Sequence, residues 1–482
     1  MIRIYCDKNI FSNIKESNPK FNSALKCLMD ELKDKMIFSY SEAHHSDLAN
    51  SNQKYWDEDL ELMSQYVKDH YFEYDAQKKN TECFLADPKS SFYNIDFEAR
   101  KNTIQLVTDL FDEILEPVED ESPEMIIARN LLNNLLNLPM PNLIPETADP
   151  KQKEYLKKFL PDSGNLTMRG MMNHMLTAGT KLLNDRTEVI EMKKMVKEYV
   201  SSEKYSFEIW KDKFDEKFKE SFGDKSFTEM METVFANNTT YNEYEKFGLF
   251  FNSLELYNVT KDKPLRKTQN LQSITTDANH AWYASFSDFL VTDDKGMLAK
   301  TYITYKYFGI KTEILDTKSF VSRKSLFLQQ EEKEANKFFD SLNYEIKNSL
   351  ILRSSKDQNL QQTAVIKNQH KFFNYFNRIS VKNGYVILYC QRHENANFVM
   401  YSELELLVNK TVALFGNDAD GKGYYDFDFD AEDSSADILR HWLFSKFELT
   451  LGSAENNGGV CLSLTLTIKN DEEPATAVDL KY

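Results

Sequence analysis

One stretch, SDFLVTDDKGMLAKTYITYKYFGIKTEILD at residues 287–316, constrains the fold more than any other part of the chain. An apolar run, Phe289 to Val291, ends in Thr292-Asp293-Asp294, a helical stretch follows, and a second strand-like run covers Lys311 to Leu315. Strand, acidic turn, helix and strand in this order are typical of a parallel βαβ unit. Ligands bind at the carboxyl ends of the strands in such units. The pattern therefore predicts a site at the acidic turn.

The first 50 residues contain a second α/β block. Ile2 to Cys6 is a plausible strand closed by Asp7, and Phe21 to Lys35 has apolar residues at helical spacing. Met36 to Phe38 is a further short strand, followed by hydroxyl groups that suit a helix N-terminus. Neither block alone has enough strands to bury a parallel sheet on both faces. We therefore predict one discontinuous domain made of residues 1–50 and 271–320.

The rest of the chain divides into two further regions. Residues 51–270 read as long helices with few strand signals, and we predict that they form a mainly helical insertion. Residues 330–482 read as a separate α+β domain with a regulatory or partner-binding role. Strands are expected there at 384–391, 398–408, 411–416 and 460–468, with an amphipathic helix at 435–447.

Composition narrows the class of protein. The formal net charge of −17 disfavours tight nucleic-acid binding unless basic residues are local or divalent cations neutralise an acidic site. Five scattered cysteines without a CxxC motif indicate reduced thiols. The start, MIRIYCDKN, lacks the long apolar stretch of a signal peptide, and no run is long enough to span a membrane. We expect a cytoplasmic protein that does not bind a membrane.

Four carboxylates fall near the ends of predicted strands: Asp7, Asp47, Asp277 and Asp294, with Asp293 as an auxiliary. In a parallel sheet these positions converge on one edge. Carboxylates crowded together raise one another's pKa, and Mg²⁺ or Mn²⁺ resolves the conflict. Such a site suits phosphodiester hydrolysis. The structural alternatives are helix caps for Asp7 and Asp277 and an exposed helix position for Asp47.

The motifs IYCDKNIF, SYSEAHHSDL and TTDANHAWYASFSDFLVTDDKGM resemble those of the PIN-domain superfamily of metal-dependent nucleases, which includes the VapC-type toxins and is related to the flap endonucleases. The family has an aspartate ending its first strand, a serine six residues before an acid-leucine pair, an aspartate opening a helix, and Thr-x-Asp ending a later strand. Ser41 to Asp47-Leu48 matches that step, with aspartate where glutamate is usual. Thr292 to Asp294 matches Thr-x-Asp.

The resemblance implies a three-layer α/β/α core and a metal-dependent nuclease. Asp7, Asp47, Asp277 and Asp294 would be its catalytic metal ligands, and its substrate would be RNA. By analogy with the family, a bacterial toxin or phage-defence effector restrained by a regulatory protein partner or by homo-oligomerisation suits this layout. Two alternatives stay open: a structure-specific DNA nuclease and a non-catalytic interaction scaffold.

Several other residues are candidates for supporting roles. His44 and His280 lie three residues from Asp47 and Asp277, so each is expected on the same helix face as its acid. Asn9 is a polar neighbour of Asp7, and Glu42 suits the first turn of a helix. A basic cluster is a candidate for contacts with a phosphate backbone, with a solvated linker as the alternative; it consists of Lys261, Lys263, Arg266 and Lys267.

Overall fold

The structure is a computed structural model of the 482-residue chain. It describes residues 1–95, 212–222, 225–237, 240–256, 271–328, 332–356, 362–382, 384–392, 398–432, 438–456 and 459–469, together with 167, 169–171, 174 and 396. The chain divides into two compact units. The first comprises Met1–Lys89, Val234–Gly248 and Ala278–Tyr482, and the second Ser90–Thr233 and Leu249–Asp277.

A six-stranded sheet, called here the core sheet, lies in the first unit with the order β4-β3-β2-β1-β5-β6. Its strands are β1 (Arg3–Cys6), β2 (Ile37–Ser41), β3 (His70–Asp75), β4 (Asn80–Leu85), β5 (Phe289–Val291) and β6 (Glu313–Leu315). All neighbours pair in parallel except β3 and β4, which form an antiparallel hairpin. Strand β1 is central, and Ile4 is paired with Phe38 on one side and with Phe289 on the other.

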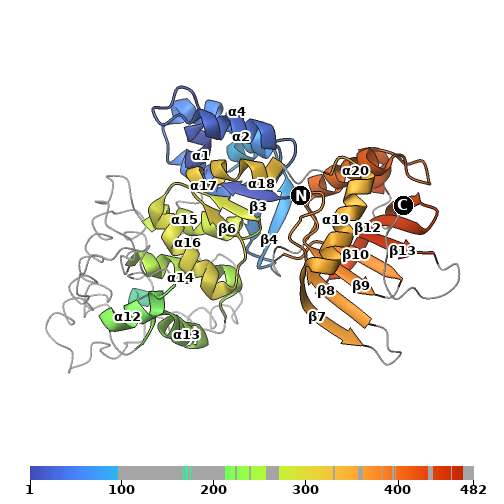
Figure 1. Cartoon of the computed structure of the whole chain (residues 1–482). Coiled ribbons are helices and arrows are strands. Elements are labelled where there is room, and N and C mark those ends of the chain that lie inside the picture. The colour runs from blue at the N-terminus through green and yellow to red at the C-terminus, as the bar shows by residue number, and fades with distance from the viewer. Residues whose placement is uncertain are drawn as a thin grey trace, which may run out of the picture. The chain divides into compact units, whose positions relative to one another are not determined.

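Helices connect the parallel strands, as Figure 1 shows. The helices α1 (Lys8–Asn13) and α2 (Ser23–Leu32) lie between β1 and β2, and α3 (Glu42–Ala49), a 3₁₀ turn at Gln53–Tyr55 and α4 (Trp56–Val67) lie between β2 and β3. Helix α16 (Lys295–Phe308) joins β5 to β6, α15 (Leu271–Ala284) precedes β5, and α17 (Thr317–Ser322) and α18 (Lys324–Leu328) follow β6. The apolar positions expected to form a helix within 21–35 are the buried side of α2, where Leu25, Leu28 and Leu32 are almost fully covered.

Two strands of the core sheet fall within 51–270, the stretch expected to be mainly helical. Strand β3 begins with the buried residues His70, Tyr71 and Phe72 and pairs in parallel with β2. Every residue of strand β4 is half-exposed or exposed, which suits an edge position. The hairpin was missed because β4 lacks a clear apolar alternation. The remaining elements that the structure describes in this stretch are α5 (Pro88–Tyr93), α12 (Phe214–Phe222), α13 (Phe227–Asn237) and α14 (Glu243–Leu256).

The second unit has an aromatic core in its described part. Phe227 at the start of α13 packs against Phe214 and Phe218 of α12, with ring centroids 5.6 and 5.3 Å apart. Phe250 of α14 lies 4.9 Å from the Phe227 ring. These rings are buried, and their edge-to-face arrangement is the one that aromatic pairs prefer.

The C-terminal region contains a seven-stranded sheet, called here the C-terminal sheet, with the order β11-β12-β13-β10-β9-β8-β7 and antiparallel pairing throughout. Its elements are α19 (Ala335–Asn348), β7 (Leu350–Lys356), β8 (Gln362–Lys367), β9 (Arg378–Lys382), β10 (Tyr385–Tyr389), α20 (Tyr401–Phe415), α21 (Phe427–Glu432), β11 (Ile438–Leu443), β12 (Phe447–Asn456) and β13 (Gly459–Ile468). Phe338 and Phe339 of α19 pack against Phe415 of α20.

Three sequence predictions in this region were wrong. The expected strands at 398–408 and 411–416 are both part of α20, whose buried residues Glu403, Leu407 and Thr411 recur every four positions. The expected helix at 435–447 is strand β11 and the start of β12. Arg440 and Trp442 are buried there at a spacing of two. A short apolar run fits the spacing of a helix as well as that of a strand, and only the burial of its side chains in the fold distinguishes the two. The predicted strands at 384–391 and 460–468 are confirmed as β10 and β13.

None of the helices in the described ranges combines the length and apolar character that crossing a membrane requires. All five cysteines are free thiols, as expected.

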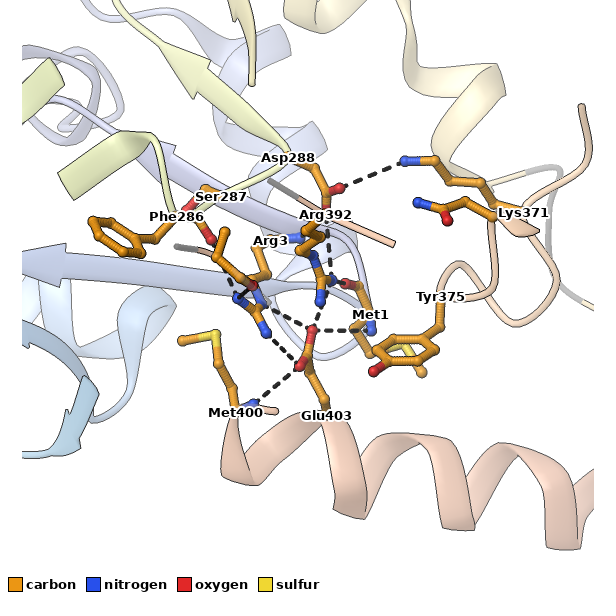
Figure 2. Close-up of polar contacts among 12 residues, drawn as sticks. Met1, Arg3, Phe286, Ser287, Asp288, Lys371, Tyr375, Arg392, Met400 and Glu403 are labelled. Atoms are coloured by element: carbon orange, nitrogen blue, oxygen red, sulfur yellow. Dashed lines mark hydrogen bonds and ion pairs between the residues drawn. The ribbon is translucent and has the colours of Figure 1, made fainter. Parts of the chain in front are cut away.

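A buried ion cluster joins β1 to α20 (Figure 2). It consists of Arg3, Asp288, Arg392, Glu403 and the amino group of Met1, with the partly exposed Lys371 at its margin. The Arg3 guanidinium donates to both oxygens of Glu403, at 2.9 Å from Nε and 2.7 Å from Nη2. Arg392 Nη2 lies 2.8 Å from Glu403 Oε1, and Lys371 Nζ lies 3.7 Å from Asp288 Oδ1. The backbone amide of Arg3 donates to Asp288 Oδ2 at 2.9 Å.

Glu403 is fully buried, so its charge depends on these partners. Burial acts to raise the pKa of Glu403, but Arg3 and Arg392 outweigh it and hold the pKa well below its usual range. The remaining Arg3 donors are used by the backbone carbonyls of Phe286, Ala396 and Phe398. Through these contacts the cluster ties the start of the central strand β1 to α20 in the C-terminal region.

Replacing Glu403 with Gln should strongly destabilise the first unit, because Arg3 and Arg392 then lose the carboxylate that pairs with both of them and only Asp288 remains to balance their charge. Breaking a buried ion pair from one side costs about 3–5 kcal/mol. Urea unfolding followed by circular dichroism measures this loss. Glu405→Gln is the matched control, because Glu405 is exposed on the same helix; an equal loss in both variants would contradict the role assigned to the cluster.

Candidate functional site

The core sheet has a topological switch point between β1 and β5. The chain runs from β1 outward through β2 to β3, and later returns to β5 on the other side of β1. In parallel sheets the crevice at such a point, at the carboxyl ends of the strands, is where ligands bind. The backbone hydrogen bonds between β1 and β5 continue one residue past the end of β1, since the Asp7 amide donates to the Val291 carbonyl at 3.0 Å. Asp7 and Thr292 are therefore held side by side at this edge.

Asp7 is a buried carboxylate with few compensating partners. It caps α1 by accepting a hydrogen bond from the Ile10 amide at 3.1 Å, and the Thr292 hydroxyl donates to its Oδ2. Burial raises the pKa of Asp7 to about 6, with a further contribution from the charge of Asp47; the hydrogen bonds from Thr292 and Ile10 and the nearby His280 act in the opposite direction. Asp7 therefore caps α1, which is the structural alternative given for it in the sequence analysis. Its carboxylate is at the same time buried in surroundings that raise its pKa.

Asp47 lies on α3, which follows β2, and its side chain is about one-third exposed. The ring of His280 on α15 donates from Nε2 to Asp47 Oδ2 across 3.1 Å. Histidine and acid were expected to pair within each helix. The structure instead pairs the histidine of one helix with the acid of the other.

His44 is a buried structural residue at the start of α3. Its Nε2 donates to the Cys6 carbonyl at 2.7 Å, and its Nδ1 accepts from the backbone amide of Ser41 at 3.1 Å. Burial lowers the pKa of His44 well below its usual value, and His280 adds to the effect, so the ring is neutral. His44 therefore completes the cap of α3 and holds the ends of β1 and β2 together.

Asp293 and Asp294 have different structural roles. Asp294 is exposed and caps α16, with Oδ1 accepting from the amides of Gly296 and Met297 at 2.7 and 3.0 Å. Asp293 accepts from the amide and hydroxyl of Thr317, at 2.9 and 2.7 Å, and so joins the end of β5 to the end of β6. Among the described contacts, the cap uses only one oxygen of Asp294.

The other predicted residues lie at or beyond the margin of this edge. Asp277 is half-buried on α15, one turn before His280, and it belongs to the second compact unit. It lies inside α15, so it does not open that helix as expected. Glu42 is in the first turn of α3, as predicted, and Asn9 is exposed on α1. The basic cluster of Lys261, Lys263, Arg266 and Lys267 lies outside the described residues.

The structure brings Asp7, Asp47 and His280 into electrostatic range of one another. Within the described residues, no three His, Cys, Asp or Glu side chains are arranged as a ready set of metal ligands. Three further groups at this edge were not predicted as functional residues: Tyr5, Ser41 and Lys8. Lys8 Nζ lies 3.3 Å from the Asp47 carbonyl. The one sequence signal for Tyr5 was a hydroxyl between the apolar residues Ile4 and Cys6 of the predicted strand.

An open groove of about 480 Å³ adjoins Asp293 at the ends of β5 and β6. Its lining residues are Asn13, Lys20, Asn22, Ala24, Asp293, Asp316, Thr317, Lys318 and Val321. Lysine and amide side chains here can contact phosphate oxygens, and the two carboxylates add negative charge to the same groove. Comparison with family models, with curated proteins and with solved structures finds no match to this chain.

The raised pKa of Asp7 predicts that Asp7→Asn stabilises the protein at neutral pH. An acid whose pKa is 3.8 in the unfolded chain and about 6 in the folded chain binds its proton more tightly when folded. Stability therefore falls as pH rises from about 4 to 6, by about 2–3 kcal/mol in total. Removing the charge should restore this amount at pH 7 and have little effect at pH 4.

Urea unfolding of both proteins between these pH values tests the prediction. Asp316→Asn is the control, because Asp316 caps α17 after β6 just as Asp7 caps α1 after β1. Hydrogen bonds from Ser319 lower the pKa of Asp316, so its contribution is present at neutral pH and is lost on acidification. Asp316→Asn should not stabilise the fold at pH 7. A stabilisation of similar size in both variants would rule out the explanation given for Asp7.

Proposed function

We propose that this protein is a metal-dependent, PIN-like nuclease that hydrolyses phosphodiester bonds, with RNA as the substrate. The observation that carries the proposal is the placement of Asp7 and Thr292 together at the switch point of a parallel sheet. These residues come from the first and last of the motifs that resemble the PIN superfamily. Helices on both sides of the core sheet in Figure 1 support a three-layer core.

The residues at this edge fit a divalent cation by their chemistry. Asp7 is buried, and its carboxylate is destabilised by burial and by the charge of Asp47. A hard cation such as Mg²⁺ or Mn²⁺ prefers carboxylate oxygens and would offset both effects. In this proposal the ligands are Asp7, Asp47 and Asp294; Asp277, the fourth ligand that the resemblance implies, belongs to the second compact unit. When bound, the cation supplies charge stabilisation and activation of water for phosphodiester hydrolysis.

The chain's own groups have defined tasks in this scheme. His280 holds Asp47 through one oxygen, and Thr292 holds Asp7. The groove beside Asp293 would take the adjoining part of the nucleic acid, with Lys20 and Lys318 near the phosphates. The C-terminal sheet and its helices are proposed as the module through which a regulatory protein or a second copy of the chain acts.

A non-catalytic scaffold is the second candidate, and one observation favours it. Asp7 and Asp294 both cap helices, so the structure gives each acid a purely structural task. The raised pKa of Asp7 speaks against this candidate, because an asparagine would cap α1 with no buried charge. A structure-specific DNA nuclease would use the same site, and substrate comparison distinguishes it from an RNA nuclease.

The test is cleavage of end-labelled single-stranded RNA, single-stranded DNA and branched DNA with Mn²⁺, Mg²⁺ or EDTA. Asp7→Asn and Asp294→Asn should each lower metal-dependent cleavage of RNA by at least about 100-fold, because each removes a charged ligand. Asp34→Asn, an exposed acid in the turn between α2 and β2 that lies outside both the site and the groove, should cleave like the wild type.

The outcomes separate the candidates. Cleavage that persists in both site variants would place the activity elsewhere or in a contaminant. Preferential cleavage of branched DNA would replace RNA as the substrate. No cleavage by any variant, together with no heat of Mn²⁺ binding in calorimetry, would leave the scaffold as the better explanation.

A further inference from the structure

A buried chain of hydrogen bonds runs from the core sheet to the carboxylate of Asp47. The Tyr5 hydroxyl lies 2.6 Å from Ser41 Oγ and 2.9 Å from His280 Nδ1. His280 Nε2 lies 3.1 Å from Asp47 Oδ2. Ser41 and Tyr5 are fully buried and His280 is 2% exposed, whereas Asp47 is one-third exposed. The chain thus connects the protein interior to a carboxylate at the candidate site.

The donors and acceptors show in which direction each hydrogen bond of this series points, from Ser41 through Tyr5 and His280 to Asp47. A carboxylate only accepts, so the Nε2 of His280 carries the proton that faces Asp47. In the neutral ring Nδ1 is then an acceptor, and the Tyr5 hydroxyl is placed to donate to it. Ser41 Oγ already accepts from the Ala43 amide at 3.3 Å, so its own proton is available to the Tyr5 oxygen.

His44 does not compete for the Tyr5 proton. Its Nδ1 lies farther from the Tyr5 hydroxyl, at 3.3 Å, and already accepts from the Ser41 amide. Burial raises the pKa of Tyr5 well above its usual value, so the hydroxyl keeps its proton. Tyr5 is therefore a permanent donor in a site without bulk water.

We propose that Tyr5 is a positioning residue that holds the ring orientation of His280 and, together with Asp47 at the other ring nitrogen, its tautomer, and thereby the orientation of the Asp47 carboxylate. The inference rests on the proposed function where it treats Asp47 as a ligand of a divalent cation. Partners that orient a ligand in this way typically change metal affinity about 10–100-fold when they are removed. Tyr5 would thus act on cation binding without touching the cation or the substrate.

The experiment uses the full chain labelled with [¹⁵N]histidine, at about pH 8, where an ordinary imidazole is neutral. The ¹⁵N shifts of His280, assigned by their absence in His280→Gln, report which nitrogen carries the proton. Calorimetry with Mn²⁺ alone measures the affinity. In Tyr5→Phe we expect His280 to become a mixture of tautomers and Mn²⁺ to bind about tenfold more weakly.

Tyr66→Phe is the matched control, since Tyr66 is equally buried and donates to Asp30 on α2 at 2.9 Å. It should lose stability as Tyr5→Phe does, but leave the His280 signals and the Mn²⁺ affinity unchanged. If Tyr5→Phe fails to fold, His280→Gln and His280→Leu carry the test. The amide of Gln can still donate to Asp47, so Gln should bind Mn²⁺ about tenfold more tightly than Leu.

A single Nε2-protonated tautomer in Tyr5→Phe, with unchanged Mn²⁺ affinity, would overturn the inference, as would equal affinities of the Gln and Leu variants. Wild-type protein that binds no Mn²⁺ would overturn the proposed function. The His280 signals of Tyr5→Phe would then test the positioning role alone. A mixture of tautomers would support this role, and a single Nε2-protonated tautomer, as in the wild type, would refute it.

Discussion

Strand β1 is buried at every residue, so each polar group on it requires a partner inside the protein. Side chains alternate along a strand, which places Arg3 and Tyr5 on the same face. Arg3 reaches Glu403 and ties β1 to α20, and Tyr5 reaches His280 and ties β1 to α15. Asp7 ends the strand and meets Thr292. The docking of the C-terminal region and the candidate site both depend on how these three polar groups are satisfied.

Two buried acids show how differently a protein can treat the same charge. Glu403 has two arginines within hydrogen-bond distance, and its pKa is lowered far below its usual range. Asp7 has one hydroxyl and one amide, and its pKa is raised to about 6. The first carboxylate is neutralised by the fold itself. Among the contacts of the described residues, the second has no arginine or lysine at hydrogen-bond distance, and it lies at the edge where a parallel sheet binds ligands.

The sequence allowed the βαβ unit around 287–316 to be predicted, because apolar strands, an acidic turn and a helical spacing are local signals. It also allowed Asp7 and Thr292 to be placed at strand ends and Asp47 on the helix after the second strand. The pairing of His280 with Asp47 was not predictable, since it joins positions 233 residues apart on two helices. The helix at 401–415 was misread for a related reason: short apolar runs fit a strand as well as a helix, and only packing decides.

The balance between stability and function bears on the choice between an enzyme and a scaffold. Helix capping alone does not require a charge at position 7, because asparagine caps as well as aspartate. A charge that lowers stability above pH 6 is expected where it takes part in binding or catalysis, since proteins accept local destabilisation mainly at such sites. The same reasoning applies to the buried Ser41, Tyr5 and His280, whose hydroxyls and ring could be replaced by apolar groups in a plain core. Both features lie at one edge of the sheet, and together they favour the catalytic interpretation over the scaffold.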